Sequence, residues 1–301
     1  MLLKELIQKG ISTISTLYPE VEAREMVLVY LQDTIGIKRH THIIEPEYEV
    51  ADEKAAEVFQ AFERLAEGEP LQYVTGTAYF YGRCFHVTPA TLIPRPETEL
   101  LCGMAVEAAA RPASRVLDLC TGSGCIAWTL ALELPQSDVV AVDLSEDALE
   151  VASGQDFAEE MQLTGAHAPT FVNADVLDSD LLSAMKQLCG QGEIPSSGKF
   201  DIILSNPPYV MDSEKAMMRK NVLDHEPHMA LFVPDSDPLL FYRAVADRAA
   251  ELLAPDGTGV VEINEALGEE TANVFRARGF AKAEVVKDLY DKDRFVRFAW
   301  K

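Results

Sequence analysis

The residues best suited to chemistry are Asn206, Pro207, Pro208 and Tyr209, which directly follow an apolar segment at Phe200–Leu204. Adjacent prolines fix the backbone angle φ and donate no hydrogen bond, so they hold a stiff turn whose carbonyl groups remain free for a ligand. The Asn206 side-chain oxygen and the Pro207 carbonyl can each accept one hydrogen from a planar NH2 group, and Tyr209 offers a flat packing surface. Carboxamides and the adenine amino group both fit this arrangement.

The nitrogen of such a group is a poor nucleophile because its lone pair is delocalised. Its reaction therefore requires orientation, desolvation and stabilisation of the developing positive charge, which carbonyl dipoles can provide. A sulfonium cofactor would supply an activated methyl group without a metal or a covalent intermediate. The competing interpretation is a turn that merely ends a strand, because Asn-Pro and Pro-Pro are common in loops. The position of the turn after a buried strand favours the catalytic interpretation.

A second loop predicts a cofactor site. A short turn of small residues joins the strand expected over Arg115–Leu119 to the helix expected over Cys125–Leu134. Glycine lets a backbone approach a ligand closely, and the start of a helix supplies unpaired N–H donors. We expect this turn to bind the cofactor through Cys120, Thr121, Gly122, Ser123 and Gly124.

Two acidic residues complete the expected cofactor site. Asp143 follows the strand expected over Asp138–Val142, where its carboxylate can accept hydrogen bonds from two ribose hydroxyls. Asp175 follows the strand expected over Thr170–Asn173 and can touch the adenine amino group. The glycine turn and Asp143 together predict an adenosine-type cofactor, which Asn206 would also contact.

Other interpretations of these residues stay open. The spacing of Gly122, Gly124 and Ala127 also fits a dinucleotide fingerprint, and a glycine turn can exist without a ligand. Asp143 can serve as a helix N-cap, although Ser145 is better placed for that role. Asp175 is equally compatible with a surface acid.

The elements that must position these loops predict an α/β protein. After Pro96, apolar strands alternate with helices in the manner of an open, mostly parallel sheet. A helix is expected over Leu181–Leu188, a surface loop over Gly190–Lys199 and another helix over Pro238–Leu253. The remaining strands are expected over Phe200–Leu204, Gly259–Ile263, Ala281–Val286 and Arg294–Ala299.

The first part of the chain differs in its pattern. Apolar residues recur at helical spacing up to about residue 70, which predicts a small domain of four or five helices. Aromatic and β-favouring residues with two glycines follow over Tyr73–Val87 and predict a hairpin. We therefore predict a helical domain over residues 1–72, a hairpin linker over 73–95 and a catalytic domain over 96–301.

Composition narrows the function classes. Apolar residues at 48% and charged residues at 25% are typical of a globular enzyme. The formal charge of −23 disfavours nucleic acid as a direct partner, because neutralising phosphates needs a basic face. We expect no membrane segment, no secretory signal and no metal site, and five cysteines without a C-x-x-C pair indicate reduced thiols in the cytoplasm. We also expect a monomer.

At these motifs the chain resembles the HemK/PrmC family of protein-(glutamine-N5) methyltransferases. The resemblance covers nearly the whole chain. Its segment Leu92–Glu99, read as LIPRPETE, separates this family from DNA methylases. The other matching motifs are Thr121–Gly124, Asp143, Asn206–Tyr209, Glu226-Pro227 and Ala230-Leu231.

The resemblance implies a Rossmann-like, seven-stranded methyltransferase domain that uses S-adenosyl-L-methionine, preceded by a β-hairpin linker and an all-α domain that recognises the substrate. It implies that class I peptide chain release factors are the partners, and that the glutamine of their Gly-Gly-Gln motif is methylated on its side-chain nitrogen. In this family reading Asn206, Pro207, Pro208 and Tyr209 bind the substrate, and Asn206, Pro207 and Tyr209 are catalytic.

The chain departs from the family pattern in two places. Cys120 stands where such families usually have a glycine, and we expect altered packing without loss of the cofactor. The loop at Gly190–Ser197 is longer than usual and puts a cofactor contact near the third strand in doubt.

Four other residues have more than one interpretation. Arg95 and Glu97 can either line the site or cap and pack the following helix. His225 and His228 flank Pro227, which interrupts any helix that would align them on a metal, so a structural loop is favoured.

Three alternatives remain at the level of sequence. A nucleic-acid adenine methylase shares the Asn-Pro-Pro-Tyr chemistry but predicts a basic groove. A nicotinamide oxidoreductase explains the glycine spacing and leaves the Asn-Pro-Pro-Tyr loop unexplained. A partner protein that binds the cofactor without turnover would have the same glycine turn but would not transfer a methyl group.

Overall fold

The computed structural model describes residues 1–109, 113–179, 181, 183, 185 and 199–301. These residues form two compact units. One unit comprises Met1–Thr77 and Met218–His225, and the other comprises Ala78–Met217 and Glu226–Lys301. Of the helix expected over Leu181–Leu188, residues 182, 184 and 186–188 lie outside the described residues, and so does the loop expected over Gly190–Lys199 except for Lys199.

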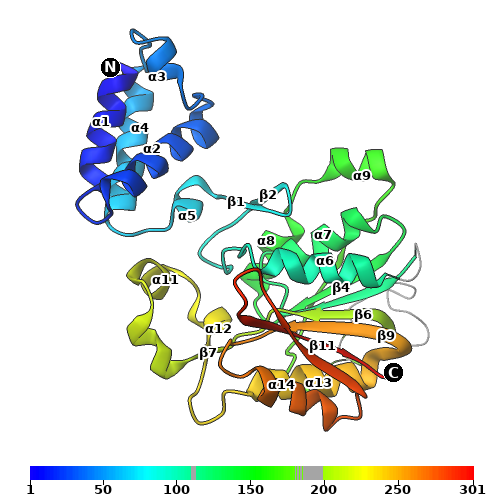
Figure 1. Cartoon of the computed structure of the whole chain (residues 1–301). Helices are drawn as coiled ribbons and strands as arrows, with labels where there is room; N and C mark the ends of the chain where they lie inside the picture. The colour runs from blue at the N-terminus through cyan, green and yellow to red at the C-terminus, as the bar shows by residue number, and fades with distance from the viewer. Residues whose placement is uncertain (110–112, 180, 182, 184, 186–198) are drawn as a thin grey trace. The chain divides into compact units, whose positions relative to one another are not determined.

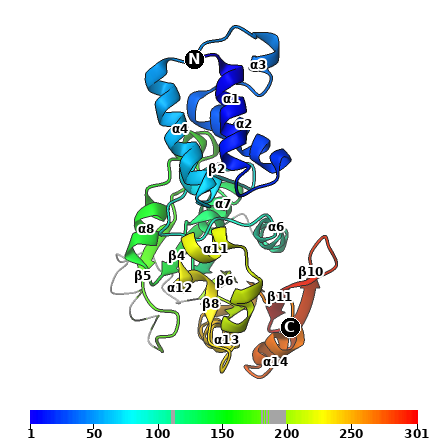
Figure 2. The same cartoon turned by 90° about the vertical axis from the view of Figure 1, so that its left-hand side faces the viewer.

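The first unit is helical, as the apolar spacing predicts. Its longer helices α1, α2 and α4 pack side by side around aliphatic residues and Phe62, whose ring meets Tyr30 edge to face (Figure 2). Burial of these apolar stripes stabilises helices that are too short to persist alone in water. The helices are α1 (Leu3–Ile14), α2 (Glu20–Ile35), α3 (Thr41–Ile44), α4 (Asp52–Ala66), α5 (Leu71–Thr75) and α11 (Lys220–His225).

The expected hairpin is present but starts later than its aromatic pattern indicates. Tyr73 and Val74 are buried within the short helix α5, which ends at Gly76 with φ of +74°. A glycine in the left-handed region is a common helix terminator, so the strands begin only after it. They are β1 (Thr77–Phe80) and β2 (Arg83–His86), which pair with each other alone in the described structure.

The second unit contains a seven-stranded sheet in the order β10-β11-β9-β6-β3-β4-β5, and the chain is therefore an α/β protein. Strands β9, β6, β3, β4 and β5 are parallel, and β11 is antiparallel to both β9 and β10. The prediction of an open, mostly parallel sheet is confirmed. The strands are β3 (Arg115–Leu119), β4 (Asp138–Asp143), β5 (Thr170–Asn173), β6 (Phe200–Ser205), β9 (Leu253–Glu262), β10 (Lys282–Lys287) and β11 (Asp293–Ala299).

Helices cover both faces of this sheet (Figure 1). Val116 belongs to the core on the side of α6 and α7, whereas its neighbour Leu117 belongs to the core on the side of α13 and α14. Successive side chains of a strand point to opposite faces, and burial on both faces explains the nearly continuous apolar sequence of the parallel strands. The helices of this unit are α6 (Thr98–Ala108), α7 (Cys125–Glu133), α8 (Glu146–Ser153), α9 (Ala158–Thr164), α12 (His228–Leu231), α13 (Leu240–Leu252) and α14 (Gly268–Arg276).

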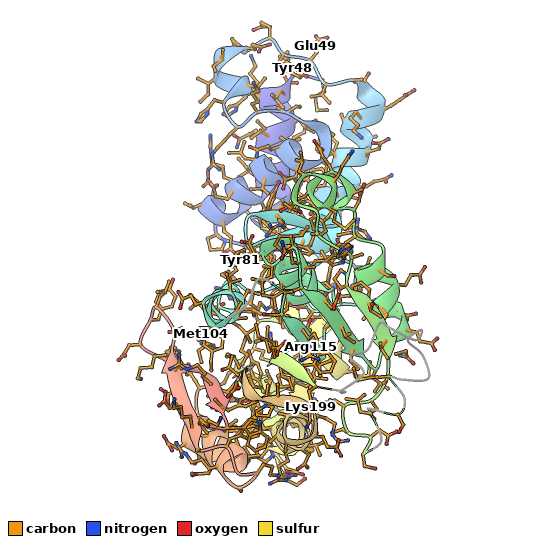
Figure 3. The ribbon with its side chains drawn as sticks, turned by 90° about the vertical axis from the view of Figure 1, so that its right-hand side faces the viewer. Tyr48, Glu49, Tyr81, Met104, Arg115 and Lys199 are labelled. Atoms are coloured by element: carbon orange, nitrogen blue, oxygen red, sulfur yellow. The ribbon has the colours of Figure 1, made fainter. Side chains whose placement is uncertain are left out.

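The order of the strands locates the functional edge of the sheet. From β3 the chain proceeds outward through β4 and β5, and then returns to β6 on the other side of β3. Ligands of such sheets bind outside the carboxyl ends of the strands at this reversal. Arg115 and Lys199 mark the opposite, amino ends of β3 and β6 (Figure 3).

Between β6 and α13 the chain forms short elements that the sequence pattern did not predict. They are β7 (Val210–Met211), the 3-10 helix η1 (Asp212–Met217), α11, α12 and β8 (Phe232–Val233), with β7 and β8 paired in parallel. In the described part of the chain, no helix has the length and apolar character needed to cross a bilayer.

Candidate active site

A cavity lies at the carboxyl edge of the sheet, lined by residues that follow β3, β4, β5 and β6. Most of the site residues expected from the sequence come together there. They are Cys120, Thr121, Gly122, Ser123, Asp143, Asp175, Asn206 and Pro208. Among the described residues that line the cavity, Gly124, Pro207 and Tyr209 do not occur.

The turn between β3 and α7 (Cys120–Gly124), called the cofactor loop, contains two glycines with different roles. A Cβ built on Gly122 would meet no atom within 4 Å, so the backbone of Gly122 borders open space in the cavity. A Cβ on Gly124 would lie 3.0 Å from the Ala152 Cβ and 3.2 Å from a ring carbon of Trp128. Gly124 therefore permits close packing at the start of α7, whereas the open space at Gly122 leaves room for a ligand to approach the backbone.

Cys120 adopts a left-handed backbone conformation with φ of +63°. A side chain in this region costs about 1–2 kcal/mol relative to the right-handed conformation, and glycine avoids that cost. The structure thus gives a backbone reason to expect a glycine at this position. Cys120 still lines the cavity and packs against the core beneath it.

Asp143 organises the cofactor loop from the end of β4. Its Oδ2 accepts a hydrogen bond from the Gly122 N–H at 2.8 Å, and its Oδ1 accepts one from the Ser145 N–H at 2.9 Å. Each carboxylate oxygen retains a further lone pair, so two ribose hydroxyls can still be accepted. Burial raises the pKa of Asp143, and these backbone donors act against that rise. Ser145 caps α8 by accepting from the Ala148 N–H, as predicted.

Asp118 is a functional candidate that sequence reasoning missed. It lies in β3, is fully buried, and accepts a hydrogen bond at 2.6 Å from the Thr121 hydroxyl of the cofactor loop. Burial raises its pKa to about 7. The available signal was an acid within an otherwise apolar strand, because a carboxyl in that place needs a partner nearby.

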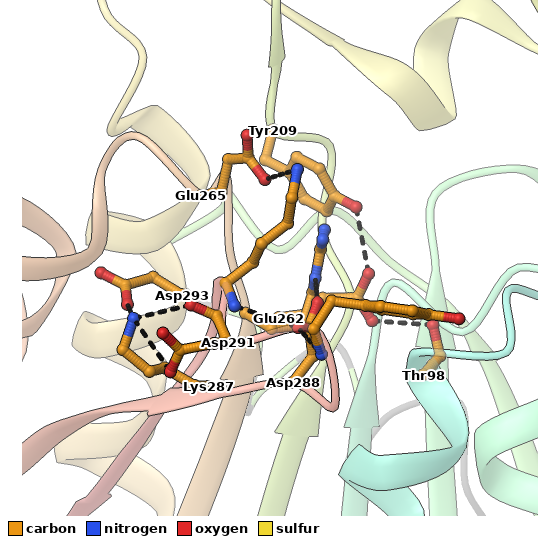
Figure 4. Close-up of polar contacts among 11 residues, drawn as sticks. Thr98, Tyr209, Glu262, Glu265, Lys287, Asp288, Asp291 and Asp293 are labelled. Atoms are coloured by element: carbon orange, nitrogen blue, oxygen red, sulfur yellow. Dashed lines mark hydrogen bonds and ion pairs between the residues drawn. The ribbon is translucent and has the colours of Figure 1, made fainter.

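The Asn-Pro-Pro-Tyr loop is held at both ends by one buried carboxylate. The Tyr209 hydroxyl donates to Glu262 Oε1 at 3.0 Å, and the Thr98 hydroxyl donates to Glu262 Oε2 at 2.7 Å (Figure 4). Thr98 in turn accepts a hydrogen bond from the Asn206 side-chain nitrogen at 3.3 Å. The Asn206 oxygen is consequently left to accept hydrogen bonds from a ligand.

Burial shapes the chemistry of this network. It raises the pKa of Glu262, against the effect of the two hydroxyl donors, and it raises the pKa of Tyr209 well above its usual value. The Tyr209 ring packs against the core, and its hydroxyl serves as a donor to Glu262. Sequence reasoning did not select Glu262 and identified Thr98 only within the LIPRPETE motif.

The LIPRPETE segment also contributes the rim of the cavity. Arg95 lines the cavity and forms an ion pair at 2.6 Å with Glu226, whose side chain is 1% exposed. Glu226 also accepts from the Ile93 N–H at 3.2 Å. Glu97 precedes α6 and makes no side-chain capping bond. The Arg95–Glu226 ion pair thus joins the LIPRPETE segment to the segment around Pro227, and both segments border the cavity.

The residues of the cavity fit an adenosine-type cofactor. The open face of Gly122, the acceptor capacity of Asp143 and apolar neighbours such as Ile126 and Ala148 provide a place for a ribose and a flat base. No group of three or more His, Cys, Asp or Glu in the described residues is arranged to hold a metal ion. His228 instead packs edge to face against Phe232.

Comparisons with known proteins identify the family of this chain. A family model for the PrmC N-terminal domain matches residues 5–76, and a model for the methyltransferase small domain matches residues 98–228. A release factor glutamine methyltransferase of Bacteroides thetaiotaomicron is 37% identical over 94% of this chain and 95% of its own length. The chain belongs to the release factor glutamine methyltransferase family.

Two further proteins are similar to this chain. The family member of Flavobacterium psychrophilum is 34% identical over 99% of both chains. The solved catalytic domain of hMettl16, in complex with the MAT2A 3'UTR hairpin 6, shares 13% identity with a TM-score of 0.53, and the match covers 83% of this chain and 82% of that one. At this identity the second similarity shows the fold alone.

Proposed function

We propose that this protein methylates the side-chain amide nitrogen of the glutamine in the Gly-Gly-Gln motif of class I peptide chain release factors. The observation that carries the proposal is the arrangement at Asn206. Its amide nitrogen is engaged by Thr98, so its oxygen can accept from the NH2 of a substrate carboxamide. Family membership supports a release factor as the substrate, because the relatives are named release factor glutamine methyltransferases.

The chain's own residues would act by orientation and electrostatics. Asn206 and Pro208 line the cavity, and Pro207 lies between them in the chain. We assign the two acceptors of the substrate NH2 to the Asn206 oxygen and the Pro207 carbonyl, which would aim the amide nitrogen across the cavity. Their dipoles stabilise the positive charge that develops on that nitrogen. The rigid turn made by Pro207 and Pro208 keeps both acceptors in place without reorganisation. Tyr209 supports the turn through the hydrogen bond that its hydroxyl donates to Glu262.

S-Adenosyl-L-methionine fits the cavity as the cofactor, and when bound it supplies an activated methyl group and leaves as S-adenosyl-L-homocysteine. Its ribose would be held by Asp143 and its adenine would lie near Asp175. The loop from Cys120 to Ser123 would pass beneath its amino acid part, with Gly122 allowing close approach. Gly124 does not line the cavity, so it would support the cofactor loop by close packing at the start of α7 and not by contact with the cofactor.

The proposed substrate also indicates where the reaction takes place. Release factors act in translation termination, so we place the reaction in the cytoplasm. We further propose that the enzyme works as a monomer, with its N-terminal helical unit recognising the factor. Direct nucleic-acid binding is disfavoured by the formal charge of −23.

The test is transfer of a labelled methyl group. The protein is incubated with methyl-labelled cofactor and one of three acceptors: a release factor, the same factor with its motif changed to Gly-Gly-Ala, or duplex DNA. Label on the intact factor alone supports the proposal. Label on DNA would replace it with adenine methylation, and no label on any acceptor would favour a cofactor-binding protein without turnover. The Asn206→Ala variant should bind cofactor and lose most transfer.

A further inference from the structure

Glu262 is a buried carboxylate in an unusual position. It is 1% exposed at the end of β9. Among the described residues no cation lies within ion-pair distance of it, and Arg294, which acts on it electrostatically, is paired with Asp288. Burying a carboxyl without an ion pair is costly, so such a group persists where its hydrogen bonds serve a purpose.

The hydrogen bonds of Glu262 determine the direction of every bond in the network. A hydroxyl has one hydrogen to donate. Thr98 gives its hydrogen to Glu262 at 2.7 Å, so towards Asn206 it can only accept. The Asn206 amide must therefore present its NH2 to Thr98 and its oxygen elsewhere. Without the carboxylate, Thr98 could donate to the Asn206 oxygen, and the reversed amide would be equally satisfied.

We propose that Glu262 is a positioning residue that fixes the orientation of the Asn206 amide through Thr98 and thereby makes the site selective for a carboxamide over a carboxylate. This inference rests on the proposed function and adds to it the origin of its specificity. Glu262 also holds the far end of the loop through Tyr209, so both ends of the four-residue turn depend on one group. The structure thus separates the residue that recognises the amide from the residue that orients it.

The consequence for specificity is direct. An Asn206 oxygen that faces the substrate attracts the NH2 of glutamine and repels the carboxylate of glutamate, which offers no hydrogen. A reversed Asn206 would present its NH2 and would accept glutamate. A site built on an unpaired acceptor discriminates strongly against a ligand that lacks the matching donor. Loss of Glu262 or of the Thr98 hydroxyl should therefore weaken the preference for glutamine.

The test measures binding, without turnover. Release factors with Gly-Gly-Gln and Gly-Gly-Glu motifs are titrated against the full-length protein in the presence of S-adenosyl-L-homocysteine. The variants are Glu262→Gln, Thr98→Val and Thr98→Ser. Valine keeps the shape of threonine and removes the hydroxyl, whereas serine keeps the hydroxyl. Glu265→Gln serves as the matched control. Glu265 is three residues from Glu262 in the chain, and its side chain forms an exposed ion pair with Lys292, so this variant makes the same chemical change outside the network.

We expect Thr98→Val and Glu262→Gln each to lower the ratio of glutamine to glutamate affinity by about tenfold or more. Thr98→Ser should recover most of that ratio relative to Thr98→Val, and Glu265→Gln should leave it unchanged. In turnover, kcat should fall further than KM rises for Glu262→Gln. Circular dichroism melts show whether each variant is folded.

Either of two results would overturn the inference. One is a glutamine preference that persists in folded Thr98→Val and Glu262→Gln. The other is an equal loss in Thr98→Ser and Thr98→Val, which would assign the effect to packing. A wild-type protein that binds and methylates no release factor would defeat the proposed function itself, and that outcome is visible before any variant is made.

Discussion

The backbone N–H of Gly122 donates to Asp143 Oδ2 at 2.8 Å, which joins the turn after β3 to the end of β4. The second oxygen of Asp143 accepts from the Ser145 N–H, so one side chain holds both loops that border the cavity. A residue expected to bind a ribose therefore also builds the loop beneath it. We therefore expect a substitution at Asp143 to change both stability and cofactor affinity.

The first prediction concerns Asp143→Asn. Asparagine replaces one acceptor oxygen by an NH2 that must face a backbone N–H, so the free energy of unfolding should fall by about 1–3 kcal/mol. Cofactor affinity should fall about tenfold or more, as measured by calorimetry. Asp138→Asn is the matched control, since Asp138 is exposed at the other end of β4. Equal effects of the two substitutions would contradict the assigned role.

The second prediction concerns the left-handed backbone of Cys120. Within a helix or strand, replacing alanine by glycine usually lowers the free energy of unfolding by about 0.5–1 kcal/mol. Where φ is positive, glycine is the favoured residue. We expect Cys120→Gly to be more stable than Cys120→Ala by about 1 kcal/mol in urea unfolding. Both variants remove the thiol, so their difference isolates the backbone. A more stable alanine variant would show that this conformation carries no strain.

The third prediction is a pH dependence from Asp118. Its pKa is about 7 in the folded protein and lies near 4 when unfolded, so the folded state holds its proton as pH rises and the unfolded state does not. Its contribution therefore lowers stability as pH rises through this window, by about 2–3 kcal/mol between about pH 5 and about pH 8. Asp118→Asn should remove that slope when unfolding is followed in urea.

The matched control for Asp118 is Asp256→Asn, because the Asp256 side chain is exposed and pairs only with Lys301 in the described structure. Its unfolding profile should keep the wild-type slope. If Asp118→Asn and the wild type respond to pH in parallel, Asp118 is ionised at both ends of the range and the burial argument is wrong.

The fourth prediction concerns the rim of the cavity. Glu226→Ala removes the partner of Arg95 and of the Ile93 N–H. Because the Arg95 side chain is 31% exposed and water can replace part of the interaction, the free energy of unfolding should fall by about 2 kcal/mol. Cofactor affinity should also fall, since Arg95 lines the cavity. Glu284→Ala, which breaks an exposed pair with Arg297, should change neither quantity appreciably.

Local sequence determined the framework of this protein. The sequence predicted strands over Arg115–Leu119 and Thr170–Asn173 with the bounds that the structure has. The first is buried on both faces, which leaves little choice of residue, whereas the second is an edge strand in which only Val172 is buried. The glycine turn, Asp143 and the Asn-Pro-Pro-Tyr loop could be recognised because each follows a strand within a few residues. These three segments meet at one edge of the sheet because they follow the carboxyl ends of parallel strands.

Tertiary structure decided which groups hold those loops. Thr98 and Glu262 are 164 residues apart, and no periodicity or spacing relates them. The partners of Asp118 and Glu226, and the packing role of Gly124, likewise depend on which elements come together. The segment between β6 and α13 folds into short elements whose apolar pattern is too brief to predict. Sequence thus revealed the chemical groups, whereas their orientation arose from hydrogen bonds between distant residues that only the folded sheet brings into contact.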